Sequence, residues 1–564
     1  MRTKKVYLRL KIVFLSLTAV FTIIILRLFW LEVVLSPRLT RLAHKEHLRL
    51  VRLPARRGRI LDTHRNILVD DIRLYSLYAD PKIIDNKDEA ASAIATVLGQ
   101  DRRKIRNLLT KDKRFVWLAR KLSLKDKKAI EELGIKGIGF REEEERFYPQ
   151  GNLLDSVIGR TDIDNNGIDG LELFYERYLH AESGQAVYLR DSRGNLLPLP
   201  KKLVLPKDGY DLILTVDSYI QYWVEKFLHQ TVVESRAKAG AVVVLNPQNG
   251  EIVAMANFVS PLAKEYLETQ RRNRCVCDFY EPGSVFKVVT LLAALEKDKE
   301  IYKEDFFCEK GQMKIPGSIL HDWRRFGKLS FIDVFKNSSN IGVAKIANRV
   351  GIPFVYSYIE KLGFGRKTGI DFPGETSGSL RPLSQWSKTD YYIVPIGQSI
   401  GVSLLQLAVA FAAVANGGYI VRPHLVKEIA SREGVAIKQF RIGRKGPIAS
   451  RFAVDKAREI LLRVVEEGTG RRAKLEKVKV CGKTGTSQKI DVRGGYSHRN
   501  FYASFVGFFP YRHPQFLIAV FIDEPHTYHY GGMIAAPLFK KIAEKIVAYK
   551  NLRSKDSETG RNTE

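Results

Sequence analysis

The hydrophobic pattern of the chain begins with one long apolar run near the N-terminus. Residues 12–26 carry no charge, and apolar residues continue past Arg27 to Leu35. As a helix, residues 12–35 would rise about 36 Å, which is enough to cross a hydrocarbon core of about 30 Å. The pattern predicts a transmembrane anchor at 12–35 after a short tail at 1–11. A cleaved signal peptide is disfavoured because no small-x-small cleavage pattern follows the run.

The rest of the chain changes in texture at about residue 209. Residues 36–208 alternate basic loops and short β-like runs, with one helical region around 121–133 and no cluster of reactive side chains. We interpret this part as an N-terminal pedestal domain. Residues 209–550 form a second domain of mixed α and β structure, and the polar residues 551–564 are predicted to be disordered. The predicted strands of the second domain lie at 211–216 and, as a pair around a turn, at 239–257. Its predicted helices lie near 285–296, 341–349, 404–415 and 452–466.

Composition and charge limit the classes of partner. The chain has 564 residues, 45% of them hydrophobic, which is sufficient for more than one core. Lys and Arg number 92 against 62 Asp and Glu, so the formal net charge is +30. Such an excess indicates an anionic partner, either nucleic acid or anionic lipid. Because the basic residues flank the apolar run and are elsewhere dispersed among acidic ones, with no recognised nucleic-acid module, we expect the membrane and no nucleic acid. A non-enzymatic basic membrane scaffold remains an alternative.

The four cysteines do not indicate a scaffold of disulfides or a four-thiolate zinc site. They are Cys275, Cys277, Cys308 and Cys481. Metal ligation by Cys275 and Cys277 is less favoured than packing, or than one disulfide that includes Cys308. The sequence therefore predicts no metal site.

Candidate chemistry begins at Ser284, which follows the turn Glu281-Pro282-Gly283 and starts an apolar helix. The spacing of three places the Lys287 amine on the same helix face as the Ser284 hydroxyl. A serine is a useful nucleophile only when a base takes its proton, and a lysine can act as that base only if its pKa is depressed. The S-x-x-K pattern is weak alone, since Ser235-Arg-Ala-Lys238 also fits it.

Two further motifs strengthen the assignment. Ser338-Ser339-Asn340 precedes an apolar helix, and Lys483-Thr484-Gly485-Thr486 follows a β-like run. In a strand, Thr484 and Thr486 would point one way, to hold a carboxylate, and Lys483 the other way, toward Ser338. Gly482 and Gly485 would let a substrate backbone approach. Lys367-Thr-Gly369 also fits the last motif, but a turn sequence follows it at once.

The ordered set S-x-x-K, S-x-N and K-T-G resembles the penicillin-binding protein and serine β-lactamase superfamily. Further segments resemble the class B penicillin-binding proteins over nearly the whole chain. The E-P-G before Ser284 and the Asn at 340 resemble the septal, FtsI-type (penicillin-binding protein 3) branch, whereas the elongation branch usually has Asp at that position. The sequence departs from the family at 62–67 and at 403–406. The supporting segments are Arg57–Asp62, Arg146–Gly151, Gly170–Glu172, Leu214–Gln221, Gly363–Gly369 and Asp523–Gly532.

The resemblance implies a peptidoglycan D,D-transpeptidase without cofactor, with a penicillin-binding-protein fold and a pedestal. Ser284 would attack the D-Ala-D-Ala amide and Lys287 would be its base. Ser338 and Lys483, the latter as a permanent charge, would pass a proton to the leaving amine. Asn340 would bind the substrate amide, Thr484 and Thr486 the carboxylate, and the backbone N–H groups of Ser284 and Thr486 the oxyanion.

The resemblance also implies partners and a location. The partners are peptidoglycan stem peptides, β-lactams as inhibitors, the cytoplasmic membrane, division proteins and a glycan polymerase of the SEDS family. The positive-inside rule hardly distinguishes the two orientations of the anchor, because basic residues lie on both of its sides. By resemblance we expect the short N-terminus in the cytoplasm and the catalytic domain outside.

Other enzyme classes are weaker alternatives. Gly397-Gln-Ser399-Ile-Gly401 is a literal G-x-S-x-G, so an α/β-hydrolase with Ser399 as nucleophile must be considered, with His498, His513, His526 or His529 available downstream. A β-lactamase is disfavoured because no E-x-x-x-N occurs between Asn340 and Lys483. A β-lactam receptor is disfavoured because eleven residues before the anchor are too few for a signalling domain.

Overall fold

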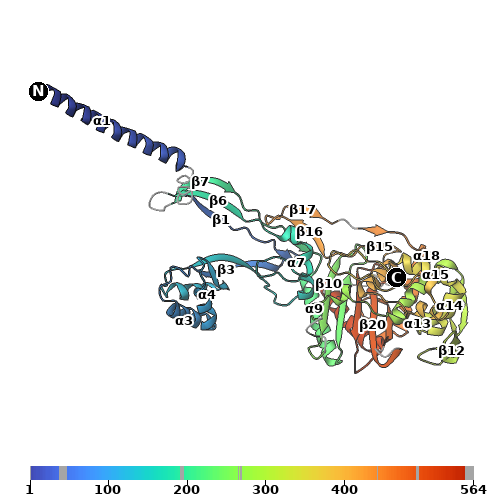
Figure 1. The fold of residues 1–564 in the computed structure, drawn as a ribbon. Coiled ribbons are helices and arrows are strands. Elements are labelled where there is room, and N and C mark those ends of the chain that lie inside the picture. The colour runs from blue at the N-terminus through green and yellow to red at the C-terminus, as the bar shows by residue number, and fades with distance from the viewer. Residues whose placement is uncertain are drawn as a thin grey trace, which may run out of the picture. The chain divides into compact units, whose positions relative to one another are not determined.

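A computed structural model divides the chain into two compact units, Met1–Arg57 with Ala181–Gly209 and Gly58–His180 with Tyr210–Glu564. The described residues are 2–36, 48–190, 196–263, 266, 270–440, 443–490 and 495–552. Most of the tail predicted to be disordered at 551–564 therefore lies outside the described residues. Figure 1 shows the ribbon and the labels of the main elements.

The first unit contains the apolar N-terminal run as one continuous helix. Helix α1 (Arg2–Phe29) continues into a π-helical turn at Trp30–Val34. Together Thr3–Val34 are long and apolar enough to cross a membrane, and their apolar side chains are exposed. The predicted anchor is therefore helical, and most of the tail at 1–11 belongs to the same helix. The unit also holds an antiparallel sheet in the order β1-β6-β7, made of β1 (Leu48–Leu53), β6 (Gly184–Arg190) and β7 (Leu196–Val204).

The N-terminal part of the second unit is built on a seven-stranded sheet that also takes in strands from far along the chain. The strand order is β17-β16-β8-β2-β3-β4, and β5 pairs with β3. The strands are β2 (Ile60–Leu61), β3 (Ile67–Ala79), β4 (Val116–Leu122), β5 (Ile138–Phe147), β8 (Asp211–Leu214), β16 (Val426–Ala430) and β17 (Ala436–Gln439). Because β8, β16 and β17 belong to the segment after residue 209, this sheet joins the pedestal to the second predicted domain.

Three helices form a small lobe beside strands β3, β4 and β5. They are α3 (Lys87–Leu98), α4 (Arg102–Leu109) and α5 (Leu124–Glu131). The helix predicted around 121–133 is partly wrong, since 116–122 is a strand and the helix begins only after Ser123. Ser123 caps it reciprocally with Asp126, which fixes that boundary. Helices α3 and α4 were not predicted.

A five-stranded antiparallel sheet organises the remainder of the second unit. The order is β10-β9-β21-β20-β19, so that β10 and β19 are its two edges. The strands are β9 (Ala239–Leu245), β10 (Ile252–Val259), β19 (Cys481–Ile490), β20 (Tyr496–Phe509) and β21 (Phe516–Asp523). The pair predicted at 239–257 is confirmed as β9 and β10, which pair antiparallel.

Helices cover both faces of this sheet and bury its apolar side chains. Helices α9 (Ser218–Glu234) and α19 (Gly531–Tyr549) pack on one face with the even-numbered Val242, Val244 and Val520. Helices α12 (Lys287–Lys297), α14 (Asn340–Val350), α17 (Leu404–Ala415) and α18 (Arg451–Glu466) share a core with the opposite face. The predicted helices at 341–349, 404–415 and 452–466 are confirmed, and the helix at 285–296 starts as a 3₁₀ turn, Gly283–Phe286.

Shorter elements connect these layers. The helices are α6 (Asp155–Ile158), α7 (Gly170–Phe174), α8 (Glu176–Leu179), α11 (Arg274–Cys277), α13 (Phe331–Lys336), α15 (Ile352–Lys361) and α16 (Asp390–Ile393). The strands are β11 (Asp305–Phe307), β12 (Gln312–Ile315), β13 (Ser318–His321), β14 (Lys328–Ser330), β15 (Ile420–Val421) and β18 (Arg444–Lys445).

Candidate active site

The turn before Ser284 lies directly against the edge strand β19. Gly283 has a φ of 57°, and a Cβ atom there would lie 2.7 Å from the carbonyl oxygen of Thr486. Only glycine accepts both this backbone conformation and this contact. Residues Gly283–Phe286 form a 3₁₀ helix, in which side chains three apart eclipse one another, so Ser284 and Lys287 share one side of the turn.

Lys287 is fully buried and its amine contacts the second motif. The Nζ atom donates to the carbonyl of Ser338 at 2.8 Å, to Asn340 Oδ1 at 2.7 Å and to Ser338 Oγ at 3.3 Å. Burial lowers the pKa of Lys287 to about 7, while the charge of Asp322 acts in the opposite direction. Lys287 therefore meets the condition that a lysine must meet to act as a base near neutral pH. The Ser284 hydroxyl makes no hydrogen bond to Lys287 or to any other described residue.

The loop of the second motif is held in a strained conformation by residues from another segment. Ser338 has a φ of 59°. Asp322 accepts hydrogen bonds from the Ser339 hydroxyl at 2.7 Å and from the Asn340 and Ile341 backbone N–H groups at 2.5 and 3.1 Å. Asp322 thus fixes the start of α14, where a carboxylate is also favoured by the helix dipole.

The neighbours of Asp322 add two contacts to the same loop. Asn340 Nδ2 donates to the carbonyl of His321 at 2.8 Å, and Trp323 Nε1 donates to the carbonyl of Asn337 at 2.8 Å. Our sequence reasoning missed Asp322, because a single acid 16 positions before Ser338 has no local pattern that marks it.

Successive side chains of the third motif point to opposite sides of β19, as predicted. Lys483 Nζ donates to Ser338 Oγ at 2.9 Å. The Thr484 hydroxyl lies 2.9 Å from that of Thr469, and the Thr486 hydroxyl accepts a hydrogen bond from Gly531 N at 3.0 Å. Lys483 and the two threonines therefore contact different sides of the strand. Thr469 is a second residue that the sequence analysis missed.

The two glycines in β19 have protein atoms in the space that a side chain would need, and the approach of a substrate backbone to them stays a prediction. A Cβ atom on Gly482 would lie 2.5 Å from the ring of Phe505. On Gly485 it would lie 2.3 Å from Ser504 Oγ and 2.9 Å from the carbonyl oxygen of Pro282. These glycines allow β19, β20 and the turn before Ser284 to pack closely.

The electrostatics of the site without substrate disfavour the permanent charge that was expected on Lys483. Burial, and then the charge of Lys287, lower the pKa of Lys483 well below its usual value. Both amines contact Ser338 in a buried site, so keeping both of them charged at once would be costly in free energy. We therefore treat the two lysines as a coupled pair that shares its protons.

The structure thus brings the predicted catalytic residues to one place and leaves the look-alike motifs outside it. Lys287, Ser338, Asn340 and Lys483 are joined by hydrogen bonds, and Ser284 and the K-T-G-T residues adjoin them. Ser235 instead ends α9 and donates to the Thr231 carbonyl at 2.6 Å. The hydroxyl and backbone N–H of Thr368 both donate to Glu375.

Ser399 is excluded as a hydrolase nucleophile by the fold around it. Its hydroxyl accepts a hydrogen bond from Arg381 at 2.8 Å, and its backbone N–H donates to Glu281 Oε1 at 2.8 Å. The five-stranded sheet is antiparallel throughout, whereas a nucleophile elbow requires a parallel α/β sheet. The segment instead supports the turn before Ser284, since Gly283 N donates to the Gly397 carbonyl at 2.9 Å.

The cysteines have structural surroundings. All four are free, so the disulfide considered for Cys308 is not formed. Cys308 is buried, with its Sγ atom 3.4 Å from the Ser339 hydroxyl oxygen. Among the described residues, no group of three or more His, Cys, Asp or Glu side chains is placed to hold a metal ion.

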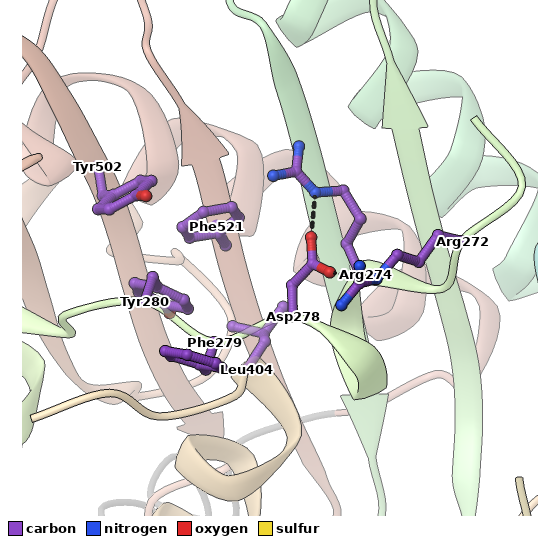
Figure 2. A pocket seen from close by; sticks show the side chains of 8 residues that line it. All are labelled: Arg272, Arg274, Asp278, Phe279, Tyr280, Leu404, Tyr502 and Phe521. Carbon is purple, nitrogen blue, oxygen red and sulfur yellow. Dashed lines mark hydrogen bonds and ion pairs between the residues drawn. The ribbon is translucent and has the colours of Figure 1, made fainter. Parts of the chain in front are cut away.

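A small cavity of about 160 Å³ lies beside residues 278–280, which lead into the turn before Ser284 (Figure 2). The rings of Tyr280, Tyr502 and Phe521 lie 4.2–5.5 Å apart there. Arg274 forms ion pairs with Asp278 and with Asp523. No residue of the three motifs is among its described lining residues, so this cavity is separate from the cluster of motif side chains. Its lining residues are Arg272, Arg274, Asp278, Phe279, Tyr280, Leu404, Tyr502 and Phe521.

A serine beside a buried lysine, a second serine and a lysine on an antiparallel edge strand together define a serine-type acyltransferase. The comparisons with known proteins agree. Residues 240–544 match the penicillin-binding protein transpeptidase domain, and residues 52–214 match the penicillin-binding protein dimerisation domain. The chain belongs to the class B penicillin-binding proteins, which are transpeptidases of peptidoglycan synthesis.

Individual relatives cover nearly the whole chain. Stage V sporulation protein D of Bacillus subtilis is 33% identical over 560 residues, 96% of this chain and 86% of that protein. The probable peptidoglycan D,D-transpeptidase PenA of Neisseria meningitidis is 34% identical over 545 residues, 95% of this chain and 91% of that protein. The crystal structure of penicillin-binding protein 3 from Mycobacterium tuberculosis in complex with aztreonam has a TM-score of 0.69 and 26% identity, and covers 89% of this chain and 98% of that one.

Proposed function

We propose that this enzyme cross-links peptidoglycan through a serine acyl-enzyme formed at Ser284. The hydroxyl oxygen of Ser284 bonds to the carbonyl carbon between the two terminal D-Ala residues of a stem peptide. The amide bond to the last residue breaks, and free D-Ala leaves. An amine of a neighbouring stem peptide then attacks the ester, which forms the cross-link and restores the serine. A β-lactam would acylate the same oxygen by opening its ring.

Lys287 would be the base that takes the Ser284 proton. Its lowered pKa makes a neutral amine available near pH 7, where general base catalysis is efficient. The proton for the leaving amine would come through Ser338 Oγ. The observation that carries the proposal is that the amines of both lysines converge on this hydroxyl, at 3.3 and 2.9 Å.

The terminal carboxylate of the substrate would complete the electrostatics of the site. Bound by Thr484 and Thr486 on the other side of β19 from the Lys483 amine, its negative charge would act across the strand, where it would favour the protonated form of Lys483. A charged Lys483 in turn favours the neutral form of Lys287. Substrate binding would thus create the charge distribution that acylation needs. Asn340 Nδ2, with one of its two hydrogens on His321, retains a donor for the substrate amide. The oxyanion would bind the backbone N–H groups of Ser284 and Thr486.

The cellular role that we propose is septal synthesis during cell division, with the catalytic domain outside the cytoplasmic membrane. Asn340 and the E-P-G before Ser284 support this branch over the elongation branch, and the FtsI of Buchnera aphidicola is 29% identical over 566 residues. A glycan polymerase of the SEDS family and division proteins would be its partners beside the anchor and the pedestal. Depletion in growing cells tests the role, because a septal enzyme gives filaments and an elongation enzyme gives rounded cells.

The activity is tested with the full-length protein in detergent and a stem pentapeptide that ends in D-Ala-D-Ala. We expect release of free D-Ala and a covalent peptide adduct, both abolished by Ser284→Ala and retained by Ser235→Ala. Release of D-Ala by the Ser284 variant at the wild-type rate would refute the mechanism.

A further inference from the structure

The turn that follows strand β13 lies against the loop of the second motif. Strands β12 and β13 pair antiparallel as a hairpin (β12 is labelled in Figure 1). The carbonyl of His321, the last residue of β13, accepts a hydrogen bond from Asn340 Nδ2, and Trp323 Nε1 donates to the carbonyl of Asn337. Residues 322–327, which we call the rim turn, therefore border Ser338, the hydroxyl that both lysine amines contact.

The backbone of the rim turn is held by the segment before β12. Asp322 N donates to the carbonyl of Gly311 at 3.1 Å, and Cys308 N donates to the carbonyl of Gly327 at 2.7 Å. Gly311 has a φ of 93°, and a Cβ atom there would lie 3.1 Å from the Cα of Arg325, at the tip of the turn. The rim turn is thus fixed at both ends and packed against Gly311 in its middle.

Trp323 is held in place and is nevertheless exposed. Its ring packs edge-on against that of the buried Phe326, with the ring centroids 5.8 Å apart, and its Nε1–H is bonded to Asn337. The residue is still 57% exposed. Because its polar atom has a partner, most of what Trp323 presents to solvent is apolar ring surface. Covering a ring that is already held in place costs little conformational entropy, which favours contact with a ligand.

The segment 305–328 also carries positive charge that no acid of the segment offsets. Asp305 pairs with Lys328 at 3.0 Å, Glu309 pairs with Lys345, and Asp322 accepts hydrogen bonds from the second motif. These are the three acids of the segment. Its cations that form no ion pair with a described residue are Lys310, Lys314, Arg324 and Arg325. Both arginines are exposed at the tip of the rim turn, directly after Trp323.

We propose that Arg324 and Arg325 bind a carboxylate of the stem peptide upstream of the scissile bond, while an apolar part of the same peptide lies on Trp323. The inference rests on the proposed function, in which Asn340 binds an amide of that peptide. The rim turn adjoins Asn340, so the preceding residues of the peptide would pass along it. An arginine fork matches the two oxygens of a carboxylate.

Two carboxylates of stem peptides have this chemistry. One is the α-carboxylate of a γ-linked D-Glu at the second residue, and the other is the side-chain carboxylate of a diaminopimelate at the third residue. Amidation of the first, or lysine in place of the diaminopimelate, removes each of them separately. The site would therefore select among stem peptides by a group that takes no part in the bond exchange.

The test measures how strongly three pentapeptides slow the labelling of full-length protein by fluorescent penicillin. They are L-Ala-γ-D-Glu-L-Lys-D-Ala-D-Ala, the same peptide with D-isoglutamine in place of D-Glu, and the D-isoglutamine peptide with meso-diaminopimelate in place of lysine. We expect one or both carboxylate peptides to halve the labelling rate at a concentration roughly fivefold lower than the D-isoglutamine–lysine peptide. The peptide that gains identifies the carboxylate.

The double variant Arg324→Gln/Arg325→Gln should require equal concentrations of the three peptides. Arg103→Gln is the matched control, because Arg103 is exposed on α4 and has no ion pair with a described residue, and it should keep the wild-type order. Each comparison is made within one variant, so a general change in labelling rate cancels. Equal concentrations in the wild type, or the wild-type order in the double variant, would overturn the proposal. Absence of labelling at Ser284 would instead refute the proposed function, on which the inference rests.

The contact with Trp323 is tested by two substitutions. Trp323→Ala should raise the half-inhibitory concentration of all three peptides roughly tenfold. Trp323→Phe keeps an aromatic face but lacks the Nε1 donor, so it should recover most of that loss. Equal weakening by the two substitutions would mean that Trp323 acts only by holding Asn337, and would overturn this contact.

Discussion

At the residue scale, the account depends on two lysines that differ in what surrounds them. Lys287 contacts Asn340 and Ser338, near the charge of Asp322, whereas Lys483 contacts Ser338 and has its pKa lowered by burial and by the charge of Lys287. The two should therefore respond differently to arginine, which cannot lose its proton in a protein.

Lys287→Arg keeps the positive charge but removes the base. We expect acylation by penicillin to fall by at least roughly 10²–10⁴-fold, the usual contribution of general base catalysis. Lys483→Arg should lose less, on the order of 10–10²-fold, through changed donor geometry. Stopped-flow acylation rates measure both. A nearly normal Lys287→Arg together with an inactive Lys483→Arg would reverse the two roles.

The pH dependence of acylation follows from the same pKa. As the proposed base, Lys287 would act in its neutral form, so the second-order rate constant should rise with pH through about 7 and then level off. Asp322 raises the pKa of Lys287, so Asp322→Asn should move this rise to lower pH and also reduce the plateau, because the Ser338 loop loses its anchor.

Asp305→Asn is the matched control, since Asp305 pairs with Lys328 at the surface and makes no contact with the loop. Its profile should equal that of the wild type. A rate that falls between pH 6 and 8, or a rise in Asp322→Asn at higher pH than in the wild type, would contradict the assignment of Lys287 as the base.

At the scale of elements, the contact between the turn Gly283–Phe286 and strand β19 depends on Gly283. Gly99 and Gly283 have nearly equal φ values of 61° and 57°, but only Gly283 has atoms near its potential Cβ. Gly99→Ala should therefore cost about 1 kcal/mol of stability through backbone strain alone and leave acylation unchanged. Gly283→Ala must also push the turn away from Thr486, and we expect acylation to fall roughly 10²-fold. Thermal unfolding and acylation rates of both variants test this difference. Equal acylation rates in Gly99→Ala and Gly283→Ala would contradict the packing argument.

Elements with a strong local signal could be predicted from the sequence. Residues 404–415 are a continuous apolar run behind Ser403, whose capping box with Gln406 fixes the helix start, and prediction and structure coincide there. Helix α4 was missed because it is short and strongly basic, with few apolar residues. Helix α3 does carry a local signal, an Asn86 cap before an alanine-rich segment, which the sequence analysis overlooked. The motif residues were found because each carries a reactive side chain at a known spacing.

Asp322 and Thr469 could not be found in this way. Their roles arise only when chain segments distant in sequence meet: Asp322 reaches the start of α14, and Thr469 reaches β19. The protonation states of Lys287 and Lys483 likewise depend on burial in the folded site, which a sequence pattern does not specify.

At the scale of the whole molecule, the net charge of +30 and the apolar helix make different predictions about membrane attachment. Attachment by charge alone would be lost at about 1 M salt, where the Debye length is about 3 Å. Attachment by a helix that spans the bilayer would persist. We expect the protein to remain in the membrane fraction at high salt with its N-terminus near Met1. Release by salt, or a mature N-terminus beyond residue 35, would refute the anchor.

The central claim is that Ser284 is the nucleophile, and the most direct measurement is the position of the covalent adduct. Purified full-length protein is treated with a fluorescent penicillin, digested, and its labelled peptide is sequenced by mass spectrometry. We predict a single adduct on Ser284, lost in Ser284→Ala and retained in Ser399→Ala and Ser235→Ala. An adduct on Ser399, or persistent labelling of the Ser284 variant, would contradict the account.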